Sequence, residues 1–106
     1  MSVGDLSPNS TMRKYGLLER DKISALLKAG AVGDILCRFI DASGNVPSHP
    51  LNDTVISADP TMLHSARRII LASGGWEKAR AVRSALRLLE PEVLITDSDV
   101  ADTLLV

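Results

Sequence analysis

Two kinds of hydrophobic pattern follow one another in the last third of the chain. Residues 67–73 and 93–97 are short runs of branched apolar side chains, and residues 76–90 carry apolar side chains at helical spacing. The short runs predict strands buried on both faces, and the stretch between them predicts an amphipathic helix. A final helix follows, with Asp97 or Ser98 as its N-cap. Strand, helix, strand and helix with short connections predict an α/β fold with a parallel sheet and right-handed crossovers.

The first two thirds are less regular. Residues 17–30 predict a helix that Gly30 ends, and residues 34–41 predict one strand, followed by a turn over residues 41–45. Two prolines exclude a central strand in residues 46–53.

Smaller features complete the pattern. Residues 54–59 predict a short strand, and Asp59 with Pro60 predicts the start of a helical segment. At the beginning of the chain, Val3 predicts the end of a strand that runs into a polar loop. Because this strand ends so early, we expect part of the domain to lie upstream.

Composition narrows the class of protein. The 106 residues fit one domain or part of one, and 45% apolar residues is usual for a globular protein. A net charge of −1 and only three aromatic residues argue against a nucleic-acid interface. With a single cysteine, an internal disulfide and a cysteine-based zinc site are excluded. No apolar run suits a membrane span or a signal peptide, so we expect a cytoplasmic protein without a membrane partner.

The first candidate site lies at residues 73–78, SGGWEK, directly after a predicted strand. Ligands of open parallel sheets bind beyond the carboxyl ends of strands. Gly74 and Gly75 allow a sharp turn that exposes backbone N–H groups at a helix N-terminus, which favours an anion. Lys78 opposes the helix dipole there unless an anion lies beside it. The alternative is a tight turn with a solvated lysine.

Asp34, at the end of the segment GAVGD, is the second candidate. It is either a solvated carboxylate or an acceptor of hydrogen bonds from sugar hydroxyl groups. Asp34 and Lys78 together match a polyol phosphate, provided that they converge in space. No third ligand is spaced to join His49 and His64, so we expect no metal and no cofactor. The pattern indicates no catalytic residue.

Three other features have simpler interpretations. Cys37 is interpreted as a small core residue on an apolar strand, and Trp76 as a packing residue at the start of a helix. Arg80, Arg83 and Arg87 form a stripe that we interpret as a solvated helix face, with contact to a partner subunit as the alternative.

The segments GAVGDILCRFIDASGN, HPLNDTVIS and RRIILASGGWEKARAVRSALRLLEPEVLITDSDVADTLL together closely resemble the C-terminal half of the sugar-binding domain of SorC/DeoR-type bacterial transcriptional regulators. The resemblance covers nearly the whole chain. It implies part of a fold like that of sugar-phosphate isomerases and glucosamine-phosphate deaminases. Its implied function is to sense a phosphorylated sugar effector, which changes the DNA affinity and oligomeric state of the full-length protein. By motif, the effector-binding residues are Asp34 and Lys78, with Gly33, Gly74 and Gly75 as backbone neighbours.

The resemblance also sets further expectations. Cys37 stands where a glycine is common, and Thr54 stands where arginine often follows LND, so either departure would alter effector choice. Residues 1–106 are expected to form a single partial effector-binding domain without the helix-turn-helix domain. We therefore expect a homo-oligomer that meets DNA only through a missing N-terminal domain, and we expect no enzyme.

Two alternatives stay open. One is an isomerase-like or deaminase-like enzyme fragment, for which Asp34 is the candidate base. The other is a dimerisation fragment without a ligand, suggested by the apolar end DTLLV. Turnover of a sugar phosphate distinguishes the enzyme from a binding module, and the effect of changing Leu104 and Leu105 on dimerisation tests the second alternative.

Overall fold

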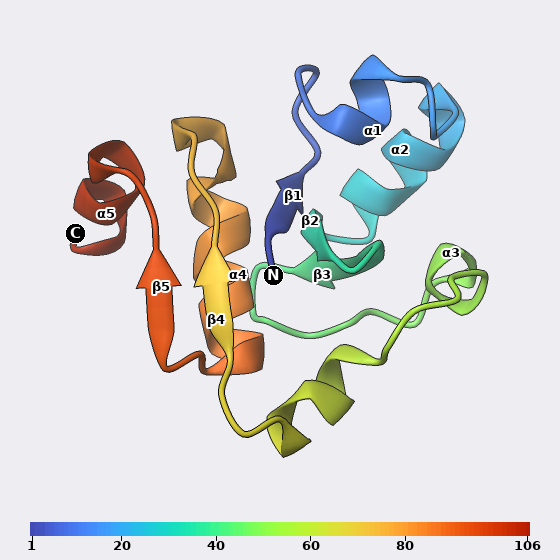
Figure 1. The fold of residues 1–106 in the computed structure, drawn as a ribbon. Coiled ribbons are helices and arrows are strands. Elements are labelled where there is room, and N and C mark those ends of the chain that lie inside the picture. Colours follow the sequence, from blue (N-terminus) through green and yellow to red (C-terminus); the bar gives the residue numbers. More distant parts are fainter.

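Short strands and helices alternate along the chain in a computed structural model, which describes residues 1–106. In chain order the elements are β1 (Val3–Asp5), α1 (Thr11–Lys14), α2 (Arg20–Lys28), β2 (Ala31–Ile35), β3 (Arg38–Asp41), α3 (Pro50–Asp53), the 3₁₀ helix η1 (Pro60–Ser65), β4 (Ile70–Ala72), the 3₁₀ helix η2 (Trp76–Lys78), α4 (Ala79–Leu89), β5 (Val93–Ile95) and α5 (Ser98–Leu104). Figure 1 shows β4 and β5 side by side, with α4 behind β4. The predicted α/β class with a parallel sheet is confirmed.

The parallel strands share one carboxyl edge. β4 and β5 pair in parallel, from Ile70 opposite Val93 to Ala72 opposite Ile95. The start of the chain extends this arrangement, because the Met1 amino group donates to the Ile70 carbonyl and the Ala72 N–H donates to the Met1 carbonyl. β1 therefore runs in the same direction as β4 and β5 (Figure 1), and all three strands end at the same edge.

The prediction of one strand over residues 34–41 is wrong. β2 and β3 form an antiparallel hairpin, and β1 pairs with the other edge of β2. Leu36 and Cys37 form the hairpin turn, with φ angles of 52° and 65°. Glycine and asparagine usually occupy such left-handed positions, so a Leu-Cys turn leaves no signal in the sequence. Cys37 is consequently exposed at the tip of the hairpin and is not a core residue.

The longer helices occur where the pattern predicts them. α2 lies within residues 17–30 and is followed by Gly30 at a φ of 89°. α4 lies within residues 76–90. Asp97 is the N-cap of α5, since its carboxylate accepts a hydrogen bond from the Val100 N–H at 2.9 Å.

Two hydrophobic clusters hold the layers together. The larger cluster joins α4 to the strands and consists of Val3, Ile35, Ile40, Ile69, Leu71, Ala81, Ala85 and Leu89. The smaller cluster places α2 against the hairpin and consists of Leu6, Leu26, Ala31 and Phe39. Gly33 lets α4 approach β2 closely, because a Cβ atom at this position would overlap the side chain of Ala81.

Only one face of the parallel strand pair is covered. Leu71 is fully buried, whereas Ile70 and Ile95 are 42% and 58% exposed. The prediction that these strands are buried on both faces is therefore wrong for this chain, because no element of residues 1–106 covers the second face. Trp76, which we expected to pack at the start of its helix, is instead 70% exposed.

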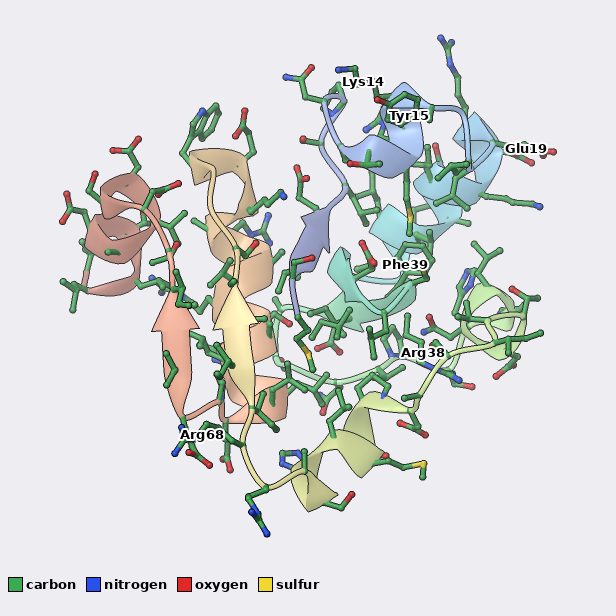
Figure 2. All side chains as sticks on the ribbon, viewed as in Figure 1. Lys14, Tyr15, Glu19, Arg38, Phe39 and Arg68 are labelled. Atoms are coloured by element: carbon green, nitrogen blue, oxygen red, sulfur yellow. The ribbon has the colours of Figure 1, made fainter.

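The segment between β3 and β4 contains no strand, so the prediction for residues 54–59 is also wrong. The guanidinium group of Arg38 organises this segment by donating to three backbone carbonyls, those of Asn52, Val55 and Ser57. Figure 2 shows Arg38 reaching from the hairpin toward this loop and α3. These side-chain hydrogen bonds take the place of a strand ladder. The helical segment η1 that follows begins at its predicted N-cap.

Candidate functional site

A cleft of about 600 Å³ opens at the carboxyl end of β1. Its walls are the loop from β1 to α1, the tip of the β2–β3 hairpin and the end of η2. The charged residues that line it are Asp5, Asp34 and Lys78. The two principal residues predicted for the site therefore lie in one cleft, although they belong to elements far apart in the sequence.

The Asp34 carboxylate is held by the turn and by a glycine across the strand. Oδ2 accepts a hydrogen bond from the Cys37 N–H at 3.2 Å. Oδ1 lies over Gly4, the residue paired with Asp34 on β1, and a Cβ atom on Gly4 would overlap it. Gly4 is therefore required at this position because the carboxylate occupies the space of a side chain. Nothing in the pattern around Gly4 predicts this role.

Burial raises the pKa of the Asp34 carboxyl group above its usual value, and the negative charge of Asp5 raises the pKa further. The Cys37 N–H and the positive charge of Lys78 act in the opposite direction, but burial prevails. An ionised carboxylate that has lost solvation gains free energy from each new hydrogen-bond donor. Hydroxyl groups of a ligand are donors of this kind.

Asp5 is a candidate site residue that the sequence analysis missed. It is only 5% exposed, and its Oδ2 accepts a hydrogen bond from the Ser7 N–H at 3.1 Å. It lies at the carboxyl end of β1, one position beyond the residue paired with Asp34. The available signal was an aspartate at the end of an apolar strand, which does not by itself distinguish a ligand-facing carboxylate from a solvated one.

Lys78 reaches the cleft from the end of η2, but the glycines before it do not line the cleft. The Gly75 N–H donates to Asp97 Oδ2 at 2.6 Å, and a Cβ atom on Gly74 would lie 2.7 Å from the same oxygen. The two glycines thus bring this loop against Asp97. The N–H groups of Gly74 and Trp76 donate to no acceptor in the chain.

Gly33, the third predicted backbone neighbour, also lies outside the lining of the cleft. It precedes Asp34 on β2 and is fully enclosed between β1 and α4. Its contribution to the geometry is indirect, because the absence of a side chain allows the strand that carries Asp34 to pack against the helix that follows Lys78.

The remaining polar side chains of the cleft include those of Ser2, Asn9, Ser10 and Thr11. Nowhere in residues 1–106 do three His, Cys, Asp or Glu side chains come together in a way that could hold a metal ion. None of the helices combines the length and the apolar character needed to cross a bilayer.

Comparison with known proteins identifies a family model and several regulators that are similar to this chain. Residues 1–106 match the family model Sugar-bind, described as "Putative sugar-binding domain". The chain is 36% identical over 103 residues to the deoxyribonucleoside regulator of Bacillus subtilis (strain 168). The aligned residues make up 97% of this chain and 33% of that regulator. The chain thus spans about a third of the length of the curated relatives that it matches.

Solved structures of transcriptional regulators also superpose on this chain. A DeoR family transcriptional regulator from Listeria monocytogenes superposes with a TM-score of 0.85 at 28% identity, covering 94% of this chain and 41% of that chain. The full-length sorbitol operon regulator SorC from Klebsiella pneumoniae has the same fold, with a TM-score of 0.84 at 24% identity, covering 99% of this chain and 34% of that chain. These relatives are regulators and not enzymes, and the resemblance drawn from the sequence is confirmed. The chain belongs to the family of sugar-binding domains found in SorC/DeoR-type transcriptional regulators.

Proposed function

We propose that this chain is part of the effector-sensing domain of a sugar-responsive regulator and binds a phosphorylated sugar in the cleft beside β1. The observation that carries the proposal is that Asp34 and Lys78 line the same cleft. Lys78 supplies the cation for the phosphate group, and Asp34 accepts hydrogen bonds from sugar hydroxyl groups. The volume of about 600 Å³ lies within the range of small-molecule sites.

The glycine loop before Lys78 lies outside the lining of the cleft. The N–H groups of Gly74 and Trp76 in this loop have no acceptor in the chain. The N–H of Gly75 is already taken by Asp97. Gly33, Gly74 and Gly75 therefore act by setting the course of the backbone on either side of the cleft.

In the whole regulator, effector binding changes DNA affinity by shifting an equilibrium between assemblies. DNA is bound by an N-terminal domain outside these 106 residues, and the protein works in the cytoplasm. Support comes from the regulators to which the chain is similar. We propose a homo-oligomer whose contact includes Leu104 and Leu105 of the apolar end DTLLV. If this end forms the contact, replacing Leu104 and Leu105 by serine abolishes dimerisation in sizing experiments.

Thermal unfolding with a panel of pentose, hexose and polyol phosphates tests the binding proposal. At about 100 times Kd, the correct ligand adds about 2.7 kcal/mol, a rise in Tm of more than about 10 °C for a domain of this size. The shift is expected to disappear in Lys78→Ala and to persist in Lys22→Ala, a matched loss of charge on the exposed side of α2. The unphosphorylated sugars serve as ligand controls. An equal shift in both variants, or none with any phosphate, contradicts the proposal.

One observation favours the enzyme alternative. The raised pKa of Asp34 is a property of general bases, which an aldose–ketose phosphate isomerase requires. We propose that the cleft binds without turnover, because the relatives of the chain are regulators and Lys78, the one cation lining the cleft, is assigned to the phosphate group. Conversion of an isotopically labelled sugar phosphate that depends on Asp34 contradicts this assignment, whereas binding without conversion supports it.

A further inference from the structure

The exposed side of α4 carries three arginines that the proposed function does not use. Arg80, Arg83 and Arg87 have the spacing i, i+3 and i+7, which places them on one face of the helix. With Ala42, Ala79 and Thr103 they line a groove of about 320 Å³. We call it the arginine groove. It shares no lining residue with the cleft that contains Asp34 and Lys78.

Two of the three guanidinium groups are held in place by backbone carbonyls on opposite sides of the groove. Arg83 donates to the Thr103 carbonyl of α5 at 2.6 Å, and Arg87 donates to the Ala42 carbonyl after β3 at 2.7 Å. A guanidinium group has five N–H donors, so most of them remain free in both residues. Because these side chains are already fixed, a ligand would immobilise them at little further cost in conformational entropy.

None of the three arginines forms an ion pair, although Asp5 and Glu77 line a neighbouring hollow together with Arg80. The one ion pair within 4 Å joins Arg68 to Glu92, where β4 and β5 begin (Figure 2). No carboxylate lines the groove. Like charges on successive turns of one helix face repel one another, and an anion bound between them removes this repulsion.

Structural roles explain part of this arrangement. Arg83 satisfies a carbonyl in the last turn of α5, and Arg87 ties α4 to the turn after β3. Arg80 makes no hydrogen bond and no ion pair, and yet it faces the same groove. The two hydrogen bonds explain why Arg83 and Arg87 are fixed, and the result is a hollow lined by three arginines and no carboxylate.

We propose that the arginine groove is a second anion site, separate from the sugar-phosphate cleft, and that it binds a small ligand with two linked phosphate groups. Arginine forks match the geometry of phosphate oxygens and make paired, charge-assisted hydrogen bonds with them. The three arginines start from positions spread over about 10 Å of helix axis, which suits two joined phosphates better than one. The proposal does not depend on the function proposed for the cleft.

Calorimetric titration of the chain with inorganic pyrophosphate at low ionic strength tests the proposal. We expect saturable binding with one site, weakened about tenfold in Arg80→Gln because one charge-assisted contact is lost. The Arg80 side chain is exposed and makes no hydrogen bond or ion pair within the chain, so this variant should fold normally. Arg87→Lys keeps the charge but loses the fork, and it should also weaken binding. Arg67→Gln, an equal loss of charge at an exposed position outside the groove, should leave the affinity unchanged.

Lys78→Ala separates the two sites. Pyrophosphate affinity retained in Lys78→Ala and lost in Arg80→Gln supports the second site, whatever the result for sugar phosphates. Affinity lost in Lys78→Ala and retained in Arg80→Gln places pyrophosphate in the cleft and overturns the proposal. Equal affinities in Arg80→Gln and Arg67→Gln, or binding of random duplex DNA without binding of pyrophosphate, also overturn it.

Discussion

Asn52 shows how one residue can replace a strand partner. It is buried, its Oδ1 accepts a hydrogen bond from the Phe39 N–H at 2.7 Å, and its Nδ2 donates to the carbonyls of Phe39 and Pro47. This side chain thus satisfies both backbone groups of Phe39 on the free edge of β3. The asparagine of the motif LND therefore has a structural role, which the sequence alone did not indicate.

We predict that Asn52→Ala lowers the free energy of unfolding by about 2 kcal/mol, because buried backbone groups lose their partners. Urea unfolding checks this value, with Asn45→Ala as the control, since Asn45 is exposed and its side chain makes no hydrogen bond. A loss no larger than that of the control would show that water replaces the amide without cost.

Cys37 adopts a left-handed backbone conformation that glycine tolerates better than any residue with a side chain. Its φ of 65° is unfavourable for a residue with a side chain. Cys37→Gly should therefore raise the free energy of unfolding by about 1 kcal/mol, whereas Cys37→Ala should leave it nearly unchanged. Urea midpoints measure both variants, and equal midpoints for the glycine and alanine variants would refute this explanation.

At the scale of elements, Asp97 connects the glycine loop to α5. Hydrogen bonds from the Val100 and Gly75 N–H groups hold its pKa below the usual 3.8. Because the folded-state pKa is lowered, the stabilisation is complete above the usual value and is lost as the pH falls through the folded-state pKa. Asp97→Ala should therefore lower Tm at pH 7, and the difference in Tm should shrink as the pH falls below 3.8. The matched control is Asp102→Ala, on the same helix. A difference in Tm between Asp97→Ala and the original chain that does not change with pH would contradict this role of Asp97.

Elements also differ in how far the sequence predicts them. α2, α4 and α5 depend on local apolar spacing, terminal glycine and caps, all of which lie within each segment. The β2–β3 hairpin depends on a turn without glycine, and the pairing of β1 with β2 joins residues about thirty positions apart. Residue type and motif singled out Asp34 and Lys78, which lie in one cleft, and their role in binding stays a prediction. Gly4 and Asp5 were not singled out, because their roles arise only when β1 lies against β2.

At the scale of the whole molecule, the site has a cost in stability. Since the pKa of Asp34 is raised by burial, the folded chain binds its proton more tightly than the unfolded chain does, and stability falls as the pH rises above 3.8. Asp34→Asn should therefore raise Tm at pH 7 and abolish the Tm shift produced by a sugar phosphate. An unliganded Tm below that of the original chain would mean that the ionised carboxylate stabilises the fold.

The measurement that tests the central claim most directly is a titration of the ¹⁵N-labelled chain with the phosphorylated sugar that stabilises it, followed by amide chemical shifts. If the cleft is the effector site, the largest changes occur at Cys37, whose N–H donates to Asp34, and at the loop from Gly74 to Lys78. Changes centred on any other surface, with these amides unmoved, would contradict the assignment of the cleft.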